Sequence, residues 1–421
     1  MTTGPSVRAA LLRFPQRSWT AARCGRCHHL QEQTMTSSRT ARTTESVRAA
    51  ESVRTVAPAH TVRAVRTADP VRTADPGDTG DRVSTIDTVR RHPERHRVLT
   101  GDRPTGPLHL GHYFGTLQNR VRLQDLGVEL FLVVADYQVL TDRDRADRPA
   151  DYAEDLVLDY LAAGIDPQRA TVFTHSAVPA LNQLMLPFLS LVSVAELGRN
   201  PTVKDEIAHA GRATVSGLMF TYPVHQAADI LFCKADLVPV GQDQLPHLET
   251  ARTVARRFNE RYGQVFPEPA PLLSASPLLL GTDGGKMSKS RGNAIPLGAD
   301  EDRTARLVRS ATTDADRHIT YDPQHRPGVA GLLQLAALCQ DRTPEEVADE
   351  IGSGGAAALK RLVTEAVNEY FRPVRRRRSE LARDRGHLRK ILAAGNEHAN
   401  AVADTTLREV RTAMGTVTAA A

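Results

Sequence analysis

The chain of 421 residues has few cysteines and no long apolar segment. Four cysteines in a chain of this size do not make the disulfide framework of a small secreted domain, and this favours a reducing compartment, the cytoplasm. No uncharged apolar run approaches the roughly 18 residues needed to cross a bilayer, so we expect no membrane segment. With 41% hydrophobic and 24% charged residues, the composition is otherwise that of a globular protein.

Lysine is also scarce, with six residues against 48 arginines, and the positive charge is unevenly placed. A formal net charge of +5 invites a nucleic-acid function. However, residues 1–97 alone hold 17 Arg, no Lys and nine acidic residues, a net charge of +8. The remainder is therefore slightly acidic, and whole-chain charge says little about what the folded part binds.

Residues 1–95 form a basic, low-complexity extension with repeated stretches, such as Glu45-Ser-Val-Arg and Glu51-Ser-Val-Arg. Because large apolar residues are sparse there, we expect this segment to be disordered. Its first 31 residues carry five Arg and no acid, as a targeting segment would. A dispensable basic arm, or a later start at Met35, is the favoured interpretation, since arginine is abundant throughout the chain.

One short pattern in the extension, Cys24-Gly-Arg-Cys27-His28, matches that of haem attachment, and with His29 it offers four zinc ligands. Haem attachment requires export, for which the sequence shows no signal peptide. Four zinc ligands within so few residues would be strained. We therefore interpret the pattern as a chance match.

Beyond the extension, apolar runs alternate with helical periodicity, which predicts a doubly wound α/β parallel sheet. The expected strands and helices lie at 98–99, 109–126, 129–135, 152–164, 171–174 and 237–240. Past residue 300 only helical patterns remain. We therefore expect a Rossmann-like catalytic domain with a helical insertion over 96–300 and an all-helical domain over 301–421.

The first expected strand–turn–helix carries the segment Arg103-Pro-Thr-Gly-Pro-Leu-His109-Leu-Gly111-His112. A helix N-terminus at the carboxyl edge of a parallel sheet binds anions through its free N–H groups and its dipole. His109 and His112 share one helix face and can donate to a phosphate, while Gly111 lets a base or ribose approach. The alternative is an ordinary helix start with incidental histidines.

A second segment, Gly284-Gly-Lys286-Met-Ser-Lys289-Ser290, places two ammonium groups three residues apart on a glycine-containing loop. Two such charges can follow a pyrophosphate leaving group into the transition state. A solvated basic turn would have the same residues. The combination of this segment with the histidine segment in one α/β domain makes that interpretation improbable.

Together these segments, HLGH at 109–112 and KMSKS at 286–290, resemble the two signatures of class I aminoacyl-tRNA synthetases. Neighbouring segments resemble the tryptophanyl branch of that class. They are Asn200-Pro-Thr-Val-Lys204, Tyr222-Pro-Val-His-Gln226-Ala-Ala-Asp229, Val238-Pro-Val240-Gly241-Gln242-Asp243-Gln244 and Phe371-Arg-Pro-Val-Arg375. The resemblance covers about residues 97–421.

The spacing of Tyr222, Gln226 and Asp229 places them on one face of a helix. There the Asp229 carboxylate could accept a hydrogen bond from an indole N–H. Such a site rejects analogues that lack the donor, because the carboxylate would be left unpaired. The alternative is that Asp229 only pairs within a core helix.

The resemblance implies a role for each remaining segment. The residues it implies for ATP binding are Arg103, Pro104, Thr105, Gly111, His112, Lys204, Gly241, Gln242, Asp243, Leu278, Lys286, Met287, Ser288, Lys289 and Ser290. Tryptophan would be bound by Tyr222, Gln226, Asp229, Val238, Val240, Gln244 and Gln138. His109, His112, Lys286 and Lys289 would be the catalytic donors.

Several residues depart from the commoner bacterial pattern of this branch. Gln138 stands at the place of a histidine near the indole, Gln226 at that of a methionine, and His109 and His112 where Thr and Asn are frequent. These departures resemble a divergent, auxiliary branch whose members include some that tolerate indole-mimicking antibiotics. Equal inhibition of this enzyme and of a histidine-bearing one by indolmycin would contradict that hypothesis.

The implied function is ATP-dependent attachment of L-tryptophan to tRNA(Trp) through an aminoacyl-adenylate. Mg²⁺ is expected to arrive with ATP, without a protein-held metal or organic cofactor, and the resemblance implies a homodimer. The run Arg375–Arg378 either contacts tRNA phosphates or is a solvated helix face. Two alternatives are a tyrosyl-tRNA synthetase, which shares the spacing of Tyr222, Gln226 and Asp229, and a non-catalytic sensor of tryptophan or tRNA.

Overall fold

The structure is a computed structural model that describes residues 86–141, 149–201, 203–204, 215–241, 244–273, 278–289 and 291–417. The expected disorder of the extension and the Cys24–Cys27 pattern lie outside these residues. Helix α1 (Ile86–Arg91) buries Val89 in the core of the folded part. The folded part therefore begins earlier than residue 96, and the expected boundary of the extension is too late.

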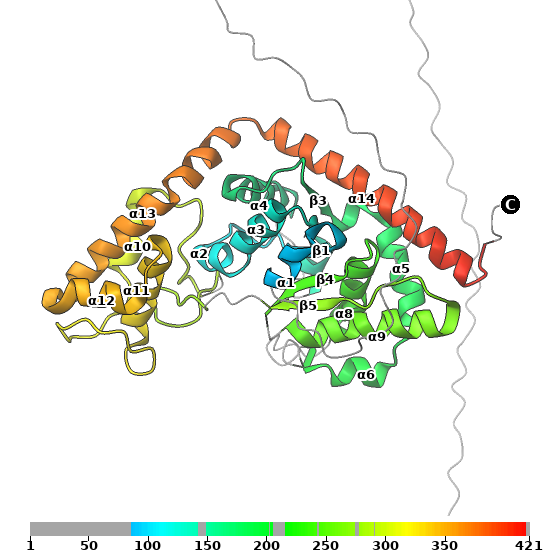
Figure 1. Cartoon of the computed structure of the whole chain (residues 1–421), viewed down its shortest axis with the longest axis horizontal. Coiled ribbons are helices and arrows are strands. Elements are labelled where there is room, and N and C mark those ends of the chain that lie inside the picture. The colour runs from blue at the N-terminus through cyan, green and yellow to red at the C-terminus, as the bar shows by residue number, and fades with distance from the viewer. Residues whose placement is uncertain are drawn as a thin grey trace, which may run out of the picture. The chain divides into compact units, whose positions relative to one another are not determined.

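A parallel sheet of five strands in the order β3-β2-β1-β4-β5 lies at the centre of the fold (Figure 1). The strands are β1 (Arg97–Asp102), β2 (Glu129–Val134), β3 (Ala170–Thr174), β4 (Leu237–Val240) and β5 (Ala270–Leu273). All adjacent pairs are parallel, which confirms the predicted doubly wound sheet. The sequence did not reveal β5, a short edge strand that contains Pro271. Proline cannot donate to the strand ladder and is commonest at sheet edges, although the neighbouring strand β4 also contains one, Pro239.

Strand β2 shows why a continuous apolar run predicts a buried parallel strand. Leu130, Leu132 and Val134 contribute to one hydrophobic core, whereas Phe131 and Val133 contribute to another. Successive side chains of a strand point to opposite faces of the sheet. Both faces are therefore covered, and every position of the strand interior is apolar.

The helix predicted over 109–126 is present and has three parts. It begins as α2 (Leu110–His112), continues through a π-helical segment at Tyr113–Leu117, and ends as α3 (Gln118–Leu126). Gly127 ends it with a left-handed backbone (φ 92°), a conformation that glycine adopts without a steric penalty. The histidine segment thus starts the helix at the carboxyl end of β1.

Ten further helices are described along the rest of the chain. They are α4 (Pro149–Ala163), α5 (Pro179–Leu189), α6 (Val194–Arg199), α8 (Gly217–Leu231), α9 (Leu245–Tyr262), α10 (Glu301–Arg309), α11 (Pro327–Gln340), α12 (Pro344–Ile351), α13 (Gly355–Leu381) and α14 (Arg385–Ala413). From residue 301 on, the described elements are helical, as predicted. Among the described residues, no helix combines the length and apolar character that spanning a membrane requires.

Helices α13 and α14 pack differently on the rest of the fold (Figure 1). Helix α13 packs on α10, α11 and α4, in the core that contains Leu130 and Leu132. Helix α14 packs on β3 and α5, and its Ala399, Ala403 and Leu407 join the core that contains Phe131. The last helix therefore completes the packing around the sheet instead of remaining with α10–α13.

Helix α14 approaches β3 very closely at Gly395. A Cβ atom added there would lie 1.9 Å from the carbonyl oxygen of Val172, so only glycine fits. At the next residue, the Asn396 side chain accepts a hydrogen bond from the Thr174 backbone N–H at 2.9 Å. This contact fixes α14 against the carboxyl end of β3.

The arginine run in α13 makes mainly internal contacts. Arg375 donates to Asn368 and Thr304, Arg377 to the carbonyl of Ala162, and Arg378 to the carboxylate of Asp159. Arg376 is exposed and lies 3.9 Å from Glu380. Three of the four arginines thus donate hydrogen bonds within the chain. Neither of the two interpretations of the run, phosphate contact or a solvated face, included such internal contacts.

Candidate active site

The first signature is built around the start of α2, where His109 is the residue before the first helical turn. The backbone N–H of His109 donates to Nδ1 of His112 at 3.2 Å, and the two rings lie 3.7 Å apart between centroids. Because Nδ1 of His112 accepts a hydrogen bond, the proton of its neutral ring sits on Nε2. That N–H is the donor this residue can offer.

Both histidines are held in the neutral form. Burial lowers the pKa of His109 to about 3, with further lowering by His112 and Lys289. Burial also lowers the pKa of His112 to about 4, and Lys289 and Arg120 add to this while Asp102 opposes it. Near pH 7 the two rings therefore act as neutral hydrogen-bond donors and not as cations.

Gly111 has a packing reason as well as its predicted role in nucleotide approach. A Cβ atom at this position would lie 3.0 Å from Cε1 and Nδ1 of His109 and 3.5 Å from Sδ of Met287. Contacts of 3.0 Å are tighter than side chains normally make. The glycine therefore lets the His109 ring fold over the start of the helix, next to the second signature.

A buried ion pair lies at the end of β1, close to His112. Arg120 of α3 donates to the Asp102 carboxylate and to the carbonyl of Gly101, and the Tyr160 hydroxyl donates to Asp102 at 2.7 Å. Burial by itself raises the pKa of Asp102, but Arg120 outweighs it, so the net shift is downward. The ionised carboxylate and its partners hold the carboxyl end of β1 to α3 and α4.

The second signature is organised by Asn293, which sequence reasoning did not single out. This side chain is 2% exposed, accepts from the backbone N–H of Ser288 at 2.8 Å, and donates to the Lys286 carbonyl at 3.0 Å. It also donates to Asp283 at 2.6 Å. One buried amide thus shapes the whole lysine loop, while the Lys286 side chain stays exposed.

The two signatures meet although 183 positions separate the residues in contact. Nζ of Lys289 donates to the carbonyl oxygen of Gly106 at 2.8 Å, in the turn that precedes His109. Backbone pairing supports this contact, because Leu110 donates to Ile295 at 3.0 Å and Leu297 donates to Leu108 at 2.8 Å. The structure therefore places the predicted catalytic histidines and Lys289 in one site.

The predicted amino-acid residues lie on α8 as expected. Tyr222 and Asp229 are buried, with 6% and 2% of their surface exposed, and Gln226 on the same helix is half-buried. The Tyr222 hydroxyl lies 2.9 Å from Nε2 of His247 in α9. His247 is a residue that sequence reasoning missed, because the contact joins two different helices.

The Asp229 carboxylate is shared between two further side chains. Its Oδ2 accepts from the amide of Gln138 at 3.2 Å, and its Oδ1 lies 2.9 Å from Nε2 of His175. Gln138 comes from the short helical segment Tyr137–Thr141, which follows β2, and His175 follows β3 directly. Residues after two neighbouring strands thus converge on one carboxylate at the carboxyl edge of the sheet.

The other predicted residues lie around this edge. Val238 is buried and Val240 half-buried on β4, Gly241 follows the strand, and Gln244 precedes α9 and donates its N–H to the Gly241 carbonyl at 3.0 Å. Arg103 and Lys204 are exposed, Thr105 is half-buried, and Pro104 is buried. Leu278 is 61% exposed. Gln242, Asp243 and Ser290 lie outside the described residues.

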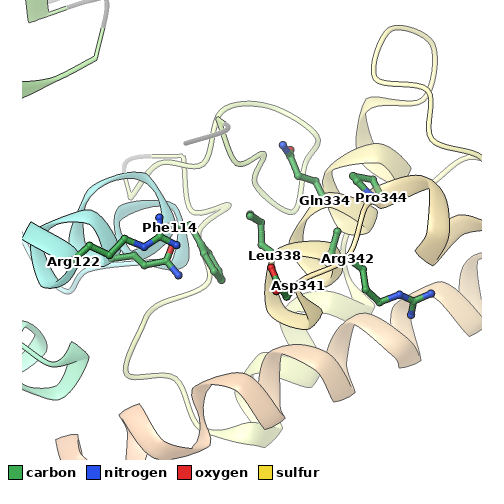
Figure 2. A pocket seen from close by; sticks show the side chains of 9 residues that line it. Phe114, Arg122, Gln334, Leu338, Asp341, Arg342 and Pro344 are labelled. Carbon is green, nitrogen blue, oxygen red and sulfur yellow. The ribbon is translucent and has the colours of Figure 1, made fainter. Parts of the chain in front are cut away.

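A separate pocket of about 230 Å³ lies between α3 and the C-terminal helices (Figure 2). Phe114 and Arg122 line it from one side, and Gln334, Leu338 and Arg342 from the other. None of the predicted catalytic or tryptophan-binding residues lines this pocket. The pocket is therefore distinct from the site at the edge of the sheet.

Comparison with known proteins gives the class that this fold and site define. The family model described as tRNA synthetases class I (W and Y) matches residues 91–372. The chain belongs to this family of class I aminoacyl-tRNA synthetases, as its two signatures predicted.

Within this class, the relatives belong to the tryptophan branch. A tryptophan–tRNA ligase of Clostridium longisporum is 42% identical over 328 residues, which are 76% of this chain and 96% of the relative. One of Treponema pallidum is 43% identical over 329 residues, with the same two shares. A crystal structure of tryptophanyl-tRNA synthetase from Campylobacter jejuni, complexed with ADP and tryptophan, matches with a TM-score of 0.67 at 30% identity, and covers 76% of this chain and 99% of that chain. These matches confirm the resemblance deduced from the motifs.

Proposed function

We propose that this chain attaches L-tryptophan to tRNA(Trp) at the expense of ATP. In the first step the tryptophan carboxylate attacks the α-phosphorus of ATP, and the bond to pyrophosphate breaks. In the second step the 2′-hydroxyl of the terminal adenosine of tRNA attacks the acyl carbon, and AMP leaves. The contact of Lys289 with the Gly106 carbonyl carries the proposal, because it brings both signatures to one site.

His109, His112, Lys286 and Lys289 are the proposed catalytic donors. No covalent bond to the protein is needed, so the rate comes from positioning and from donors directed at developing negative charge. Two observations support these roles. The histidines are neutral donors near pH 7, and both lysines belong to a loop held by the buried amide of Asn293.

The proposed ATP contacts surround the start of α2 and the lysine loop. They are Arg103, Pro104, Thr105, Gly111, His112, Lys204, Gly241, Gln242, Asp243, Leu278, Lys286, Met287, Ser288, Lys289 and Ser290. The free N–H groups of a helix N-terminus and the ammonium groups suit the phosphates. When bound to the ATP phosphates, Mg²⁺ would neutralise part of their charge, and we propose that it enters with the nucleotide.

The proposed tryptophan contacts are Tyr222, Gln226, Asp229, Val238, Val240, Gln244 and Gln138. Asp229 would accept the indole N–H, and the apolar side chains of β4 would pack on the ring. The near-complete burial of the Asp229 carboxylate supports this role, because a desolvated carboxylate discriminates strongly for a ligand that supplies a donor.

We also propose that the helical part from residue 301 contacts the anticodon of tRNA, beside a catalytic part that extends to about residue 300. A homodimer that acts in the cytoplasm completes the proposal. The mass of the full chain in solution, measured by light scattering, tests the dimer, and a monomer at micromolar concentration would contradict it.

Amino-acid-dependent exchange of pyrophosphate into ATP tests the proposed activation step. With full-length protein, L-tryptophan should support exchange at micromolar concentrations, and L-tyrosine should not. Exchange that prefers tyrosine would identify a tyrosine enzyme. Absence of exchange with either amino acid would favour a non-catalytic protein and refute the proposal.

A further inference from the structure

A buried polar cluster lies behind Asp229, on the side away from Gln138. It contains His175 from the short segment after β3, Asn182 from α5, and His225 one turn before Asp229 on α8. His175 is 0% exposed, and His225 4%. Neither histidine was among the residues predicted to bind tryptophan or ATP.

Asn182 fixes the orientation of the His225 ring. Its amide nitrogen donates to the carbonyl of His175 at 2.8 Å and to that of Val178 at 3.0 Å, which leaves its oxygen as the acceptor. That oxygen lies 2.8 Å from Nε2 of His225, so Nε2 carries the proton. Burial lowers the pKa of His225, and the neutral ring therefore presents an unprotonated Nδ1.

The Oδ1 atom of the Asp229 carboxylate faces this cluster. Nε2 of His175 lies 2.9 Å from this oxygen, and the rings of His175 and His225 meet edge-on at 4.8 Å between centroids. Within the described part of the chain, Oδ1 has no aligned hydrogen-bond donor, and neither ring nitrogen of His175 has a hydrogen-bond partner. The two side chains are therefore in close contact, without a well-aligned hydrogen bond.

A buried carboxylate needs a compensating group, because removal from water strongly disfavours its charge. Gln138 supplies a neutral donor to Oδ2. On the other side, the ionisable groups that act on His225 are Asp229, His175 and Asp136, and Asp136 is itself acidic. Among these described groups, only His175 lies against Oδ1.

We propose that His175 is a positioning residue for tryptophan binding, which holds the Asp229 carboxylate so that its Oδ2 side is presented to the indole N–H. His225, oriented by Asn182, closes the cluster and confines His175. This inference rests on the proposed function, because it concerns the same carboxylate. It adds two histidines to the determinants of tryptophan selectivity.

A metal ion is the other occupant that three such side chains could suit, since their ligand atoms all lie within 4.8 Å of one another. Two ligand atoms about 2.0 Å from a tetrahedral zinc ion lie roughly 3.3 Å apart. The separation of 2.9 Å between His175 and Asp229 is shorter and fits direct contact of the two side chains. Asp229 already shares its other oxygen with Gln138, which also fits a substrate-facing carboxylate.

The test compares full-length wild type with H175L, H175Q, D229N and H175L/D229N in pyrophosphate exchange. Loss of a hydrogen bond or contact to a charged group changes binding by about tenfold to a hundredfold. We expect H175L to raise KM for tryptophan by that factor, with KM for ATP and kcat within about threefold of wild type. H175Q retains a donor and should recover most of the loss. H398L, in a histidine that stacks on Phe131, is the matched control and should behave as wild type.

Selectivity and coupling provide the decisive readouts. Benzothienylalanine replaces the indole N–H by sulfur, so H175L should reduce the preference for tryptophan over this analogue. In the D229N background, H175L should have no added effect.

Unchanged KM for tryptophan in H175L, or additive effects in the double variant, would overturn the inference and leave the proposed function intact. If D229N itself leaves KM for tryptophan unchanged, both this inference and the role of Asp229 in the proposed function fail. Stoichiometric zinc in the purified protein, lost in H175Q, would overturn the inference in favour of a metal site.

Discussion

Removal of Arg378 should show how strongly its ion pair with Asp159 joins α13 to α4 and to the turn before His109. Nε of Arg378 donates at 2.7 Å to Oδ1 of Asp159, whose side chain is 1% exposed. The other oxygen of Asp159 accepts from the backbone N–H of Leu108 at 3.1 Å, one residue before His109. Burial raises the pKa of Asp159 even with Arg378 present. In R378A this carboxylate loses the cation that compensates its burial.

Breaking a buried ion pair on one side costs about 3–5 kcal/mol. Because the Arg378 side chain is 24% exposed, we expect the lower end, about 3 kcal/mol, for R378A. The measurement is urea unfolding of the full chain followed by circular dichroism. Without Arg378 the pKa of Asp159 rises further, so the carboxyl takes up a proton more readily and the loss should be smaller at pH 5 than at pH 8.

The double variant D159N/R378A separates this explanation from a simple loss of packing. It removes the buried charge together with its partner, and its free energy of unfolding should exceed that of R378A. R376A alters the exposed arginine of the same run and should stay within about 0.5 kcal/mol of wild type. A loss below about 1 kcal/mol in R378A, or one that does not depend on pH, would refute the argument.

Three further predictions concern the site and the packing of α14. K289A should lower the pyrophosphate exchange rate by about 10²–10³, because a directed charge is lost. It should lower the free energy of unfolding by no more than about 1.5 kcal/mol, because one hydrogen bond, to the Gly106 carbonyl, is lost without a cavity. Since the pKa values of His109 and His112 are lowered to about 3 and about 4, the unfolded chain binds protons between pH 6.5 and pH 4 that the folded protein does not. Stability should therefore fall as pH falls through this window, and less steeply in H112Q. G395A should destabilise the protein by about 1–3 kcal/mol, because the added Cβ meets the Val172 carbonyl.

Each of these predictions has a matched control. K360A changes a lysine that donates to the Arg309 carbonyl in the helical part, and should not affect exchange. Gly115 has open space around an added Cβ, so G115A should be neutral or slightly stabilising where G395A is not. Equal effects of a variant and its control, or an identical pH dependence of stability in H112Q and wild type, would contradict the corresponding structural explanation.

The main features of the fold could be predicted because they depend on local patterns. The run at Glu129–Val134 is apolar at every interior position, and a strand buried on both faces requires that. Strand β5 is also apolar, but a run of four residues does not by itself distinguish a strand from another segment, and its place at the edge follows only from pairing with β4. The early start of the folded part was missed for a similar reason, because α1 contributes little more than Val89 to the core.

The site was predictable where chemistry and spacing coincide, as in the two signatures and the face of Asp229. His247 and His175 were missed because their contacts join different elements of the fold, to Tyr222 and Asp229 respectively. Asn293 was missed although its partners are close in the sequence, because the folded loop conformation alone shows that this amide is buried among them. A signal was present for His175, which directly follows a predicted strand at the edge where the site lies. For the arginine run, the sequence left phosphate contact and a solvated face open, and it could not show the internal partners of Arg375, Arg377 and Arg378, which come from other segments.

Transfer of tryptophan to tRNA tests the central claim most directly. With purified full-length protein, ATP and total bacterial tRNA, we predict that labelled L-tryptophan becomes acid-precipitable on tRNA, and that labelled L-tyrosine does not. K289A should slow this transfer in parallel with exchange. Charging with tyrosine, or tryptophan activation without any transfer to tRNA, would contradict the account.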